Sequence, residues 1–133
     1  MNLGKLTVCL IVALTGSSLA AENQPACEHA QDVVAGCFTV HGRLSIYMGA
    51  PSFRIWRIGA TRILGILNAG SDPQPETPRL PPGVLRQLQR DPARMAVFGD
   101  YRVCPLTKEQ PEHMQYVCFE AAAHLVAKPR NSN

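Results

Sequence analysis

Hydrophobic and polar residues alternate through residues 38–47, a pattern that predicts a β-strand with one buried and one solvated face. The polar parity carries His41 and Arg43, and the apolar parity carries mostly branched and aromatic side chains. Gly42 falls on the apolar parity, where a glycine indicates a bulge or a sharp bend. We therefore expect this strand to curl, as the strands of a small barrel do.

Two shorter segments continue this pattern. Residues 48–51 contain a Gly-Ala-Pro turn signal, and residues 52–58 alternate again with aromatic and β-branched side chains that favour strands. After a second glycine-containing turn, residues 62–67 form an apolar run with strand character. The three segments together predict a meander of three strands.

The second half of the chain begins with a proline-rich stretch, residues 68–82, which predicts an irregular surface loop or crossing connection. A short helix is expected from Pro82, followed by a fourth strand over residues 95–104 and a fifth over residues 114–119. Residues 120–126 fit either a strand or a helical stripe, and the sequence leaves both open.

This order of elements over residues 37–126 resembles a five-stranded OB-type barrel, although a small β-sandwich would give a similar order. The segments HGRLSIYMGAPSFRIWRIG and VFGDYRVCPL are similar to those of small exported bacterial proteins of unassigned function. We expect a mainly β fold, in a β-rich α+β sense. It would be a small five-stranded OB-like barrel or meander with one short helix between strands 3 and 4.

Residues 1–20 have the layout of a secretory signal peptide: the cation Lys5, an apolar run over residues 6–14 and a small polar stretch that ends at Ala20. The apolar run is shorter than the roughly 20 residues of a membrane-spanning helix, which makes a retained anchor the weaker alternative. We expect cleavage after Ala20 and a periplasmic or secreted mature protein that does not insert into the membrane.

The expected organisation is a signal peptide at 1–20, an N-terminal segment at 21–36, a single β-rich domain at 37–127 and a frayed tail at 128–133. A mature chain of this length can bury one modest hydrophobic core. Its oligomeric state stays open.

The formal charge argues against a nucleic-acid partner. The chain has 13 Lys and Arg residues and 10 Asp and Glu residues, a net charge of +3, and cleavage would remove Lys5 from that total. The remaining charge of about +2 is too small for the electrostatic binding on which nucleic-acid recognition depends.

Cysteine usage agrees with an exported protein. Cleavage removes Cys9 and leaves Cys27, Cys37, Cys104 and Cys118, an even number that predicts two disulfides in an oxidising compartment. Proximity along the chain favours the bonds Cys27–Cys37 and Cys104–Cys118, but spacing alone does not establish connectivity.

Metal and thiol-redox chemistry have weaker support. No two cysteines are separated by two residues, the spacing expected of a thiol-redox enzyme. A zinc site assembled from Cys104, His113, Cys118 and His124 is an alternative, but it lacks the closely spaced ligand pairs of zinc fingers. We expect neither a metal nor a cofactor.

Catalytic motifs are scarce. The chain has no Gly-x-Ser-x-Gly elbow and no phosphate-binding glycine loop, so an enzyme is the less expected interpretation. Asp100, with a histidine as its acid-base partner, is the best candidate for a small periplasmic hydrolase. The competing interpretation pairs Asp100 with Arg102, with Arg43 or with a turn amide. A third possibility is an inhibitor or stabiliser of a secreted enzyme that uses the loop at 69–82.

The most distinctive local feature is Trp56, which lies between Arg54 and Arg57. An aromatic ring beside arginine on an open sheet is typical of surfaces that stack sugars, but Trp56 also fits a core position. With His41 and Arg43 on the neighbouring strand, we predict a ligand-binding patch of His41, Arg43, Arg54 and Trp56. The favoured function is a non-enzymatic binding or interaction module of the bacterial cell envelope, with a glycan, peptide or protein partner.

Overall fold

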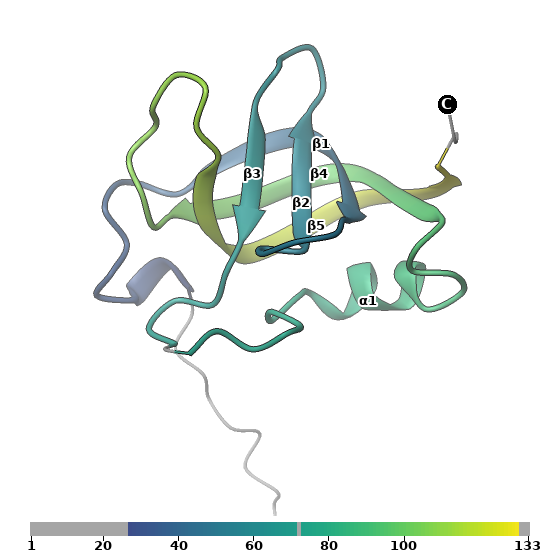
Figure 1. Ribbon diagram of the computed structural model, residues 1–133, viewed down its shortest axis with the longest axis horizontal. Coiled ribbons are helices and arrows are strands. Elements are labelled where there is room, and N and C mark those ends of the chain that lie inside the picture. The colour runs from purple at the N-terminus through teal and green to yellow at the C-terminus, as the bar shows by residue number, and fades with distance from the viewer. Residues whose placement is uncertain (1–26, 72, 131–133) are drawn as a thin grey trace, which may run out of the picture.

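The computed structural model describes residues 27–71 and 73–130 (Figure 1). The predicted signal peptide and the first residues of the N-terminal segment lie outside this range. The described elements are a short 3-10 helix, five strands and one α-helix: η1 (Cys27–His29), β1 (Phe38–Ile46), β2 (Phe53–Arg57), β3 (Ile63–Ile66), α1 (Pro82–Leu88), β4 (Met95–Pro105) and β5 (Gln115–Pro129).

The five strands form one sheet that closes on itself in a ring. β1 pairs antiparallel with both β2 and β4, β2 pairs with β3, and β5 pairs antiparallel with β4. A parallel pairing of β3 with β5 completes the ring. The helix α1 lies between β3 and β4 in the chain and packs against β4 and β5 below the strands in Figure 1. This arrangement confirms the expected mainly β fold with OB-like element order.

Gly42 lies where β1 has partners on both edges. β4 pairs with β1 over Phe38–Leu44, and β2 pairs with it over Gly42–Ile46. A Cβ atom on Gly42 would lie 2.5 Å from Ile55 Cγ2 and 2.9 Å from the carbonyl oxygen of Trp56. Because backbone cannot move aside as a flexible side chain does, this close approach requires glycine.

The core fills the inside of the ring. Tyr101 is its largest fully buried side chain; its hydroxyl donates a hydrogen bond to the Val97 carbonyl, and its ring packs edge-on against Phe119 with centroids 5.4 Å apart. The helix α1 adds Val84 and Leu88 to this cluster. Other residues buried in it are Leu44, Ile55, Leu64, Ile66, Val97, Val103 and Val117.

Residues 120–126, which the sequence left open, continue β5 as a strand, and β5 extends to Pro129. Their pairing with β4 is irregular, with a register shift between Phe98 and Asp100. A bulge of this kind breaks strict alternation, which is why the apolar positions of this segment also matched a helical stripe.

Two disulfides join residues that precede β1 to the strands β4 and β5: Cys27–Cys118 and Cys37–Cys104. The pairing favoured by chain proximity is therefore wrong. Proximity along the chain determines the entropy of loop closure in the unfolded state, whereas strand pairing determines which cysteines are neighbours in the folded state. Phe38 is opposite Val103 in the β1–β4 ladder, so Cys37 lies beside Cys104. Two disulfides indicate an oxidising, extracellular environment. None of the described helices is long and apolar enough to span a bilayer.

Candidate functional site

Asp100 lies between two histidines on the outer surface of the sheet. It is directly opposite His41 in the β1–β4 ladder, and Asp100 Oδ1 is 2.9 Å from His41 Nδ1. Its other carboxylate oxygen, Oδ2, is 2.8 Å from Nδ1 of His124 on β5. The side chains of His41 and His124 are 60% and 83% exposed, so the cluster is open to solvent.

The bulge in β5 brings His124 into this cluster. His124 has a φ of 54°, in the left-handed region, and both Ala123 and His124 are exposed where strict alternation would turn one of them inward. Gly99 of β4 lies against the bulge, and a Cβ there would be 2.7 Å from Leu125 Cδ2. The bulge therefore turns His124 outward while Leu125 packs against the core.

The two imidazoles keep Asp100 ionised. Hydrogen bonds from His41 and then from His124 are the main causes that lower the pKa of Asp100 below its ordinary value of 3.8. Because an ionised carboxylate only accepts hydrogen bonds, both Nδ1 atoms carry a proton and donate it to Asp100. Asp100 contacts only the Nδ1 atom of each ring. The Nε2 atom is therefore the ring nitrogen at which a ligand can bind.

A row of cationic and aromatic side chains crosses the sheet next to these histidines. Arg43 is opposite Trp56 of β2 on one side and Phe98 of β4 on the other. Its guanidinium carbon is 5.8 Å from the centroid of the Trp56 ring, and Lys128 Nζ is 5.3 Å from that of Phe98. We use the name cation-aromatic face for the surface formed by His41, Arg43, Trp56, Phe98, Asp100, His124 and Lys128.

Three of the four residues of the predicted patch, His41, Arg43 and Trp56, lie in this face. Arg54 has a different position: its Nε and Nη2 donate to the carbonyl oxygens of Pro51 and Met48, at 2.9 and 3.3 Å. Its guanidinium also stacks on Tyr47, 5.3 Å from the ring centroid. Arg54 therefore holds the turn between β1 and β2.

The sequence allowed either a surface or a core position for Trp56, and its burial is intermediate between the two. The residue is half-buried, and its Nε1 atom is buried without a hydrogen-bond partner among the described residues. One part of the ring is thus fixed in the sheet, and Arg43 lies over the ring.

Sequence reasoning did not place Phe98, His124 and Lys128 in the site. Phe98 could have been found, because it shares the strand parity of Asp100. His124 gave no such signal, since the bulge shifts its parity. The expected arginine partners of Asp100 are replaced by the two histidines, while Arg102 lies 3.5 Å from the carboxylate of Glu28.

The zinc alternative loses two of its ligands, because Cys104 and Cys118 are each bonded to another cysteine. Among the described residues, one group of His, Cys, Asp and Glu has three donor atoms within 4.8 Å of one another: Cys27, Cys104 and Cys118. The donors of His41, Asp100 and His124 do not converge in this way.

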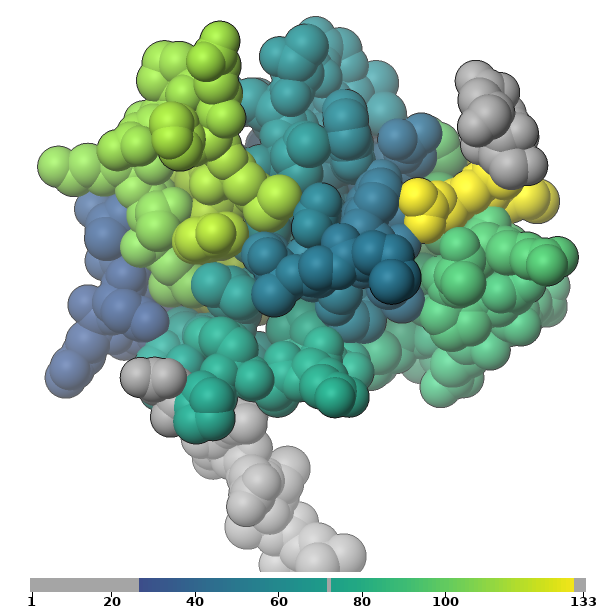
Figure 2. Space-filling model, in the orientation of Figure 1, coloured from purple at the N-terminus to yellow at the C-terminus, as the bar shows by residue number. Residues whose placement is uncertain are grey.

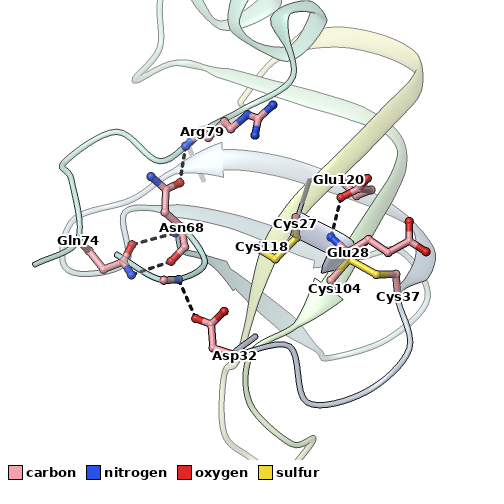
Figure 3. Close-up of a disulfide and its surroundings, with 11 residues drawn as sticks. Cys27, Glu28, Asp32, Cys37, Asn68, Gln74, Arg79, Cys104, Cys118 and Glu120 are labelled. Carbon is pink, nitrogen blue, oxygen red and sulfur yellow. Dashed lines mark hydrogen bonds between the residues drawn. A yellow bond between two sulfur atoms is a disulfide. The ribbon is translucent and has the colours of Figure 1, made fainter. Parts of the chain in front are cut away.

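Several hollows in the described part of the chain lie away from the cation-aromatic face. One of about 690 Å³ lies beside the Cys27–Cys118 disulfide and is lined by Asp32, Asn68 and Arg79, among others (Figure 3). Another, of about 570 Å³, lies between the turn after β2 and the loop before β5, which stand side by side in Figure 2. None of these hollows in the described residues is lined by His41, Asp100 or His124.

No protein family matches this chain, and no curated protein or solved structure shows significant similarity to it. Its function is therefore inferred from its own residues and geometry.

Proposed function

We propose that this protein is a non-enzymatic binding module of the cell envelope that holds an anionic glycan against the cation-aromatic face. The observation that carries the proposal is the position of Arg43 between Trp56 and Phe98, with Lys128 over Phe98. Guanidinium and ammonium groups bind carboxylates or phosphates, and the rings of Trp56 and Phe98 hold these two cations on the surface of the sheet.

The histidines extend this surface with groups suited to hydroxyls. Each imidazole is hydrogen-bonded to Asp100 through Nδ1, so Nε2 is the ring nitrogen at which a ligand can form a hydrogen bond. Sugar hydroxyls are donors of matching chemistry. The face carries Arg43 and Lys128 against the single carboxylate of Asp100, which favours an anionic over a cationic glycan.

The alternative of a small hydrolase has one supporting observation, because an aspartate that orients a histidine through Nδ1 is an arrangement of hydrolytic enzymes. Two physical reasons favour binding. The cluster lies outside the cavities that would exclude water from a reacting bond. No described contact brings a hydroxyl or thiol nucleophile to either imidazole. A hydrolase would lose its activity in Asp100→Asn while keeping its fold.

A periplasmic or secreted location belongs to the same proposal. Its support is the pair of disulfides, together with the signal-peptide pattern of residues 1–20. Envelope and extracellular polysaccharides are the anionic glycans available there.

The test follows the fluorescence of Trp56, the one tryptophan of the chain, during titration with polygalacturonate at low ionic strength. We expect Arg43→Gln to weaken binding by about tenfold or more, because it removes a central cation of the face. Arg90→Gln removes the same charge from an exposed position after α1 and should leave affinity nearly unchanged. Equal losses in the two variants, or equal binding of neutral dextran, would contradict the proposal.

A further inference from the structure

The sulfur atoms of the two disulfides lie next to one another. Cys104 of β4 is directly opposite Cys118 of β5, and the Sγ atoms of Cys27, Cys104 and Cys118 all lie within 4.8 Å of one another. Figure 3 shows the two bonds side by side. A thiolate formed at one of these positions would therefore lie beside the disulfide of the other pair.

The four cysteine residues differ in their exposure to solvent. Cys104 is fully buried and Cys27 and Cys118 are nearly so, whereas Cys37 is half-buried. Thiol-disulfide exchange begins with attack of a thiolate on an accessible sulfur. An external thiol should thus react first at Cys37.

We propose that Cys37 is a thiol-modification site whose reaction is relayed through Cys104 and Cys118 to release a free thiol at Cys27. In the first step, the thiolate of a low-molecular-weight thiol attacks Cys37 Sγ. The Cys37–Cys104 bond breaks, a mixed disulfide forms at Cys37, and Cys104 leaves as a thiolate.

In the second step, the Cys104 thiolate attacks Cys118 Sγ. A Cys104–Cys118 bond forms, the Cys27–Cys118 bond breaks, and Cys27 leaves as a thiolate that can take a proton from water. Two protein disulfides and one external thiol become one protein disulfide, one mixed disulfide and one free thiol. The sequence of steps needs no oxidant.

Cys118 is the preferred target because residues directly opposite in an antiparallel pair have Cα separations of about 4.5–5.5 Å, within the range that disulfides span. Cys27 lies in the three-residue helix η1, outside the sheet, so no strand pairing aligns it with Cys104.

The product places a nucleophile in a cavity. Cys27 lines the hollow of about 690 Å³ together with Asp32, Asn68 and Phe119. Its thiolate can therefore attack the disulfide of a molecule bound there, which forms a mixed disulfide at Cys27 and releases the other half of that molecule as a thiol. The relay also removes the covalent link between η1 and β5.

Tryptic mapping tests the relay, because the cysteines fall on three peptides: one ending at Arg43 with Cys27 and Cys37, residues 103–108 with Cys104, and residues 109–130 with Cys118. In the native protein, the two disulfides join all three. After limiting glutathione and trapping with N-ethylmaleimide, we expect peptide 103–108 joined to peptide 109–130 alone. The peptide ending at Arg43 should carry glutathione on Cys37 and maleimide on Cys27, positions that its fragment-ion spectrum assigns.

Two results would overturn the proposal. Glutathione on the first peptide with maleimide on Cys104 would show that no relay occurs. A bond between the first peptide and 103–108, with maleimide on Cys118, would show that Cys118, and not Cys27, is the released thiol.

The matched control is Cys27→Ser/Cys118→Ser, which keeps the Cys37–Cys104 bond but removes the acceptor. There, glutathione should leave Cys104 to be alkylated. In a second variant, Cys37→Ser, Cys104 is a thiol from the start, and we expect isolation with a Cys104–Cys118 bond and a free Cys27. A Cys37→Ser protein that retains Cys27–Cys118 with alkylatable Cys104 would contradict the relay.

Discussion

Two imidazoles together keep Asp100 ionised. The stability that these contacts give to the outer surface of the sheet therefore depends on pH. Each histidine reaches it from a different strand, so the carboxylate connects β1 and β5 across β4. Loss of its charge should weaken both contacts together.

We expect Asp100→Asn to reduce stability only at pH values where the native carboxylate is ionised. The pKa of Asp100 is below 3.8 in the folded protein, so the unfolded state takes up its proton first as the pH falls. The stabilising contribution is therefore present above pH 3.8 and is lost as the pH drops through the lower, folded pKa.

Thermal melting of the native protein and Asp100→Asn, from neutral pH downward, checks this expectation. The difference in melting temperature should be largest in the neutral and mildly acidic range and should shrink below pH 3.8. A difference of constant size at every pH would mean that the substitution perturbs packing rather than charge.

At the scale of single elements, alternation predicted the strands at residues 38–47 and 52–58, because a half-buried strand repeats every two residues, and an apolar run predicted the strand at residues 62–67. Prediction failed where an element departs from that period. The β5 bulge at His124 lies against Gly99 across the ladder, a tertiary relation that local sequence does not show. The surface residues on regular β1, His41 and Arg43, were predictable, whereas His124 was not.

The crowded position of Gly42 in β1 gives an element-scale prediction. Gly42→Ala should lower the free energy of unfolding by about 2 kcal/mol, because the new methyl group meets Ile55 and the backbone of Trp56. Gly36→Ala is the matched control, since a Cβ there has no neighbour within 4 Å, and its effect should stay within about 0.5 kcal/mol. Urea unfolding of both variants measures the two changes in free energy of unfolding. Equal changes would contradict the prediction, because they would show that β2 shifts enough to accommodate the methyl group.

At the scale of the whole molecule, the disulfides are nested: Cys27–Cys118 spans 91 positions and encloses Cys37–Cys104, which spans 67. Once either bond has formed, the other closes a much shorter loop. Each bond should therefore stabilise the fold less in the presence of its partner than alone.

We expect removal of one disulfide by alanine substitution to lower the free energy of unfolding by about 3.5 kcal/mol while the other remains, and by about 4.5 kcal/mol once the other is gone. Urea unfolding of the two single-bond variants and the variant without disulfides, in a stabilising osmolyte, completes the cycle. Strictly additive losses would contradict this chain-entropy account.

The number of disulfides followed from composition, but their connectivity did not. Cys37 is close to Cys27 in the chain, yet the β1–β4 ladder places it beside Cys104. Knowing the strand order would have indicated this pair; knowing the spacing of cysteines could not. For the same reason, the part of the site on the consecutive strands β1 and β2 could be predicted, whereas the part on β4 and β5 could not.

The β1–β4 pairing also sets the order in which the molecule can fold. β1 is synthesised early, but its partner follows only after β2, β3 and α1, and ring closure waits for β5. Contacts so distant in sequence make folding slow, on a scale of about milliseconds to seconds. During that interval Cys27 and Cys37 are near each other with no native partner yet available. A premature bond between them would have to reopen, so the last strands to be synthesised decide the partners of the first cysteines.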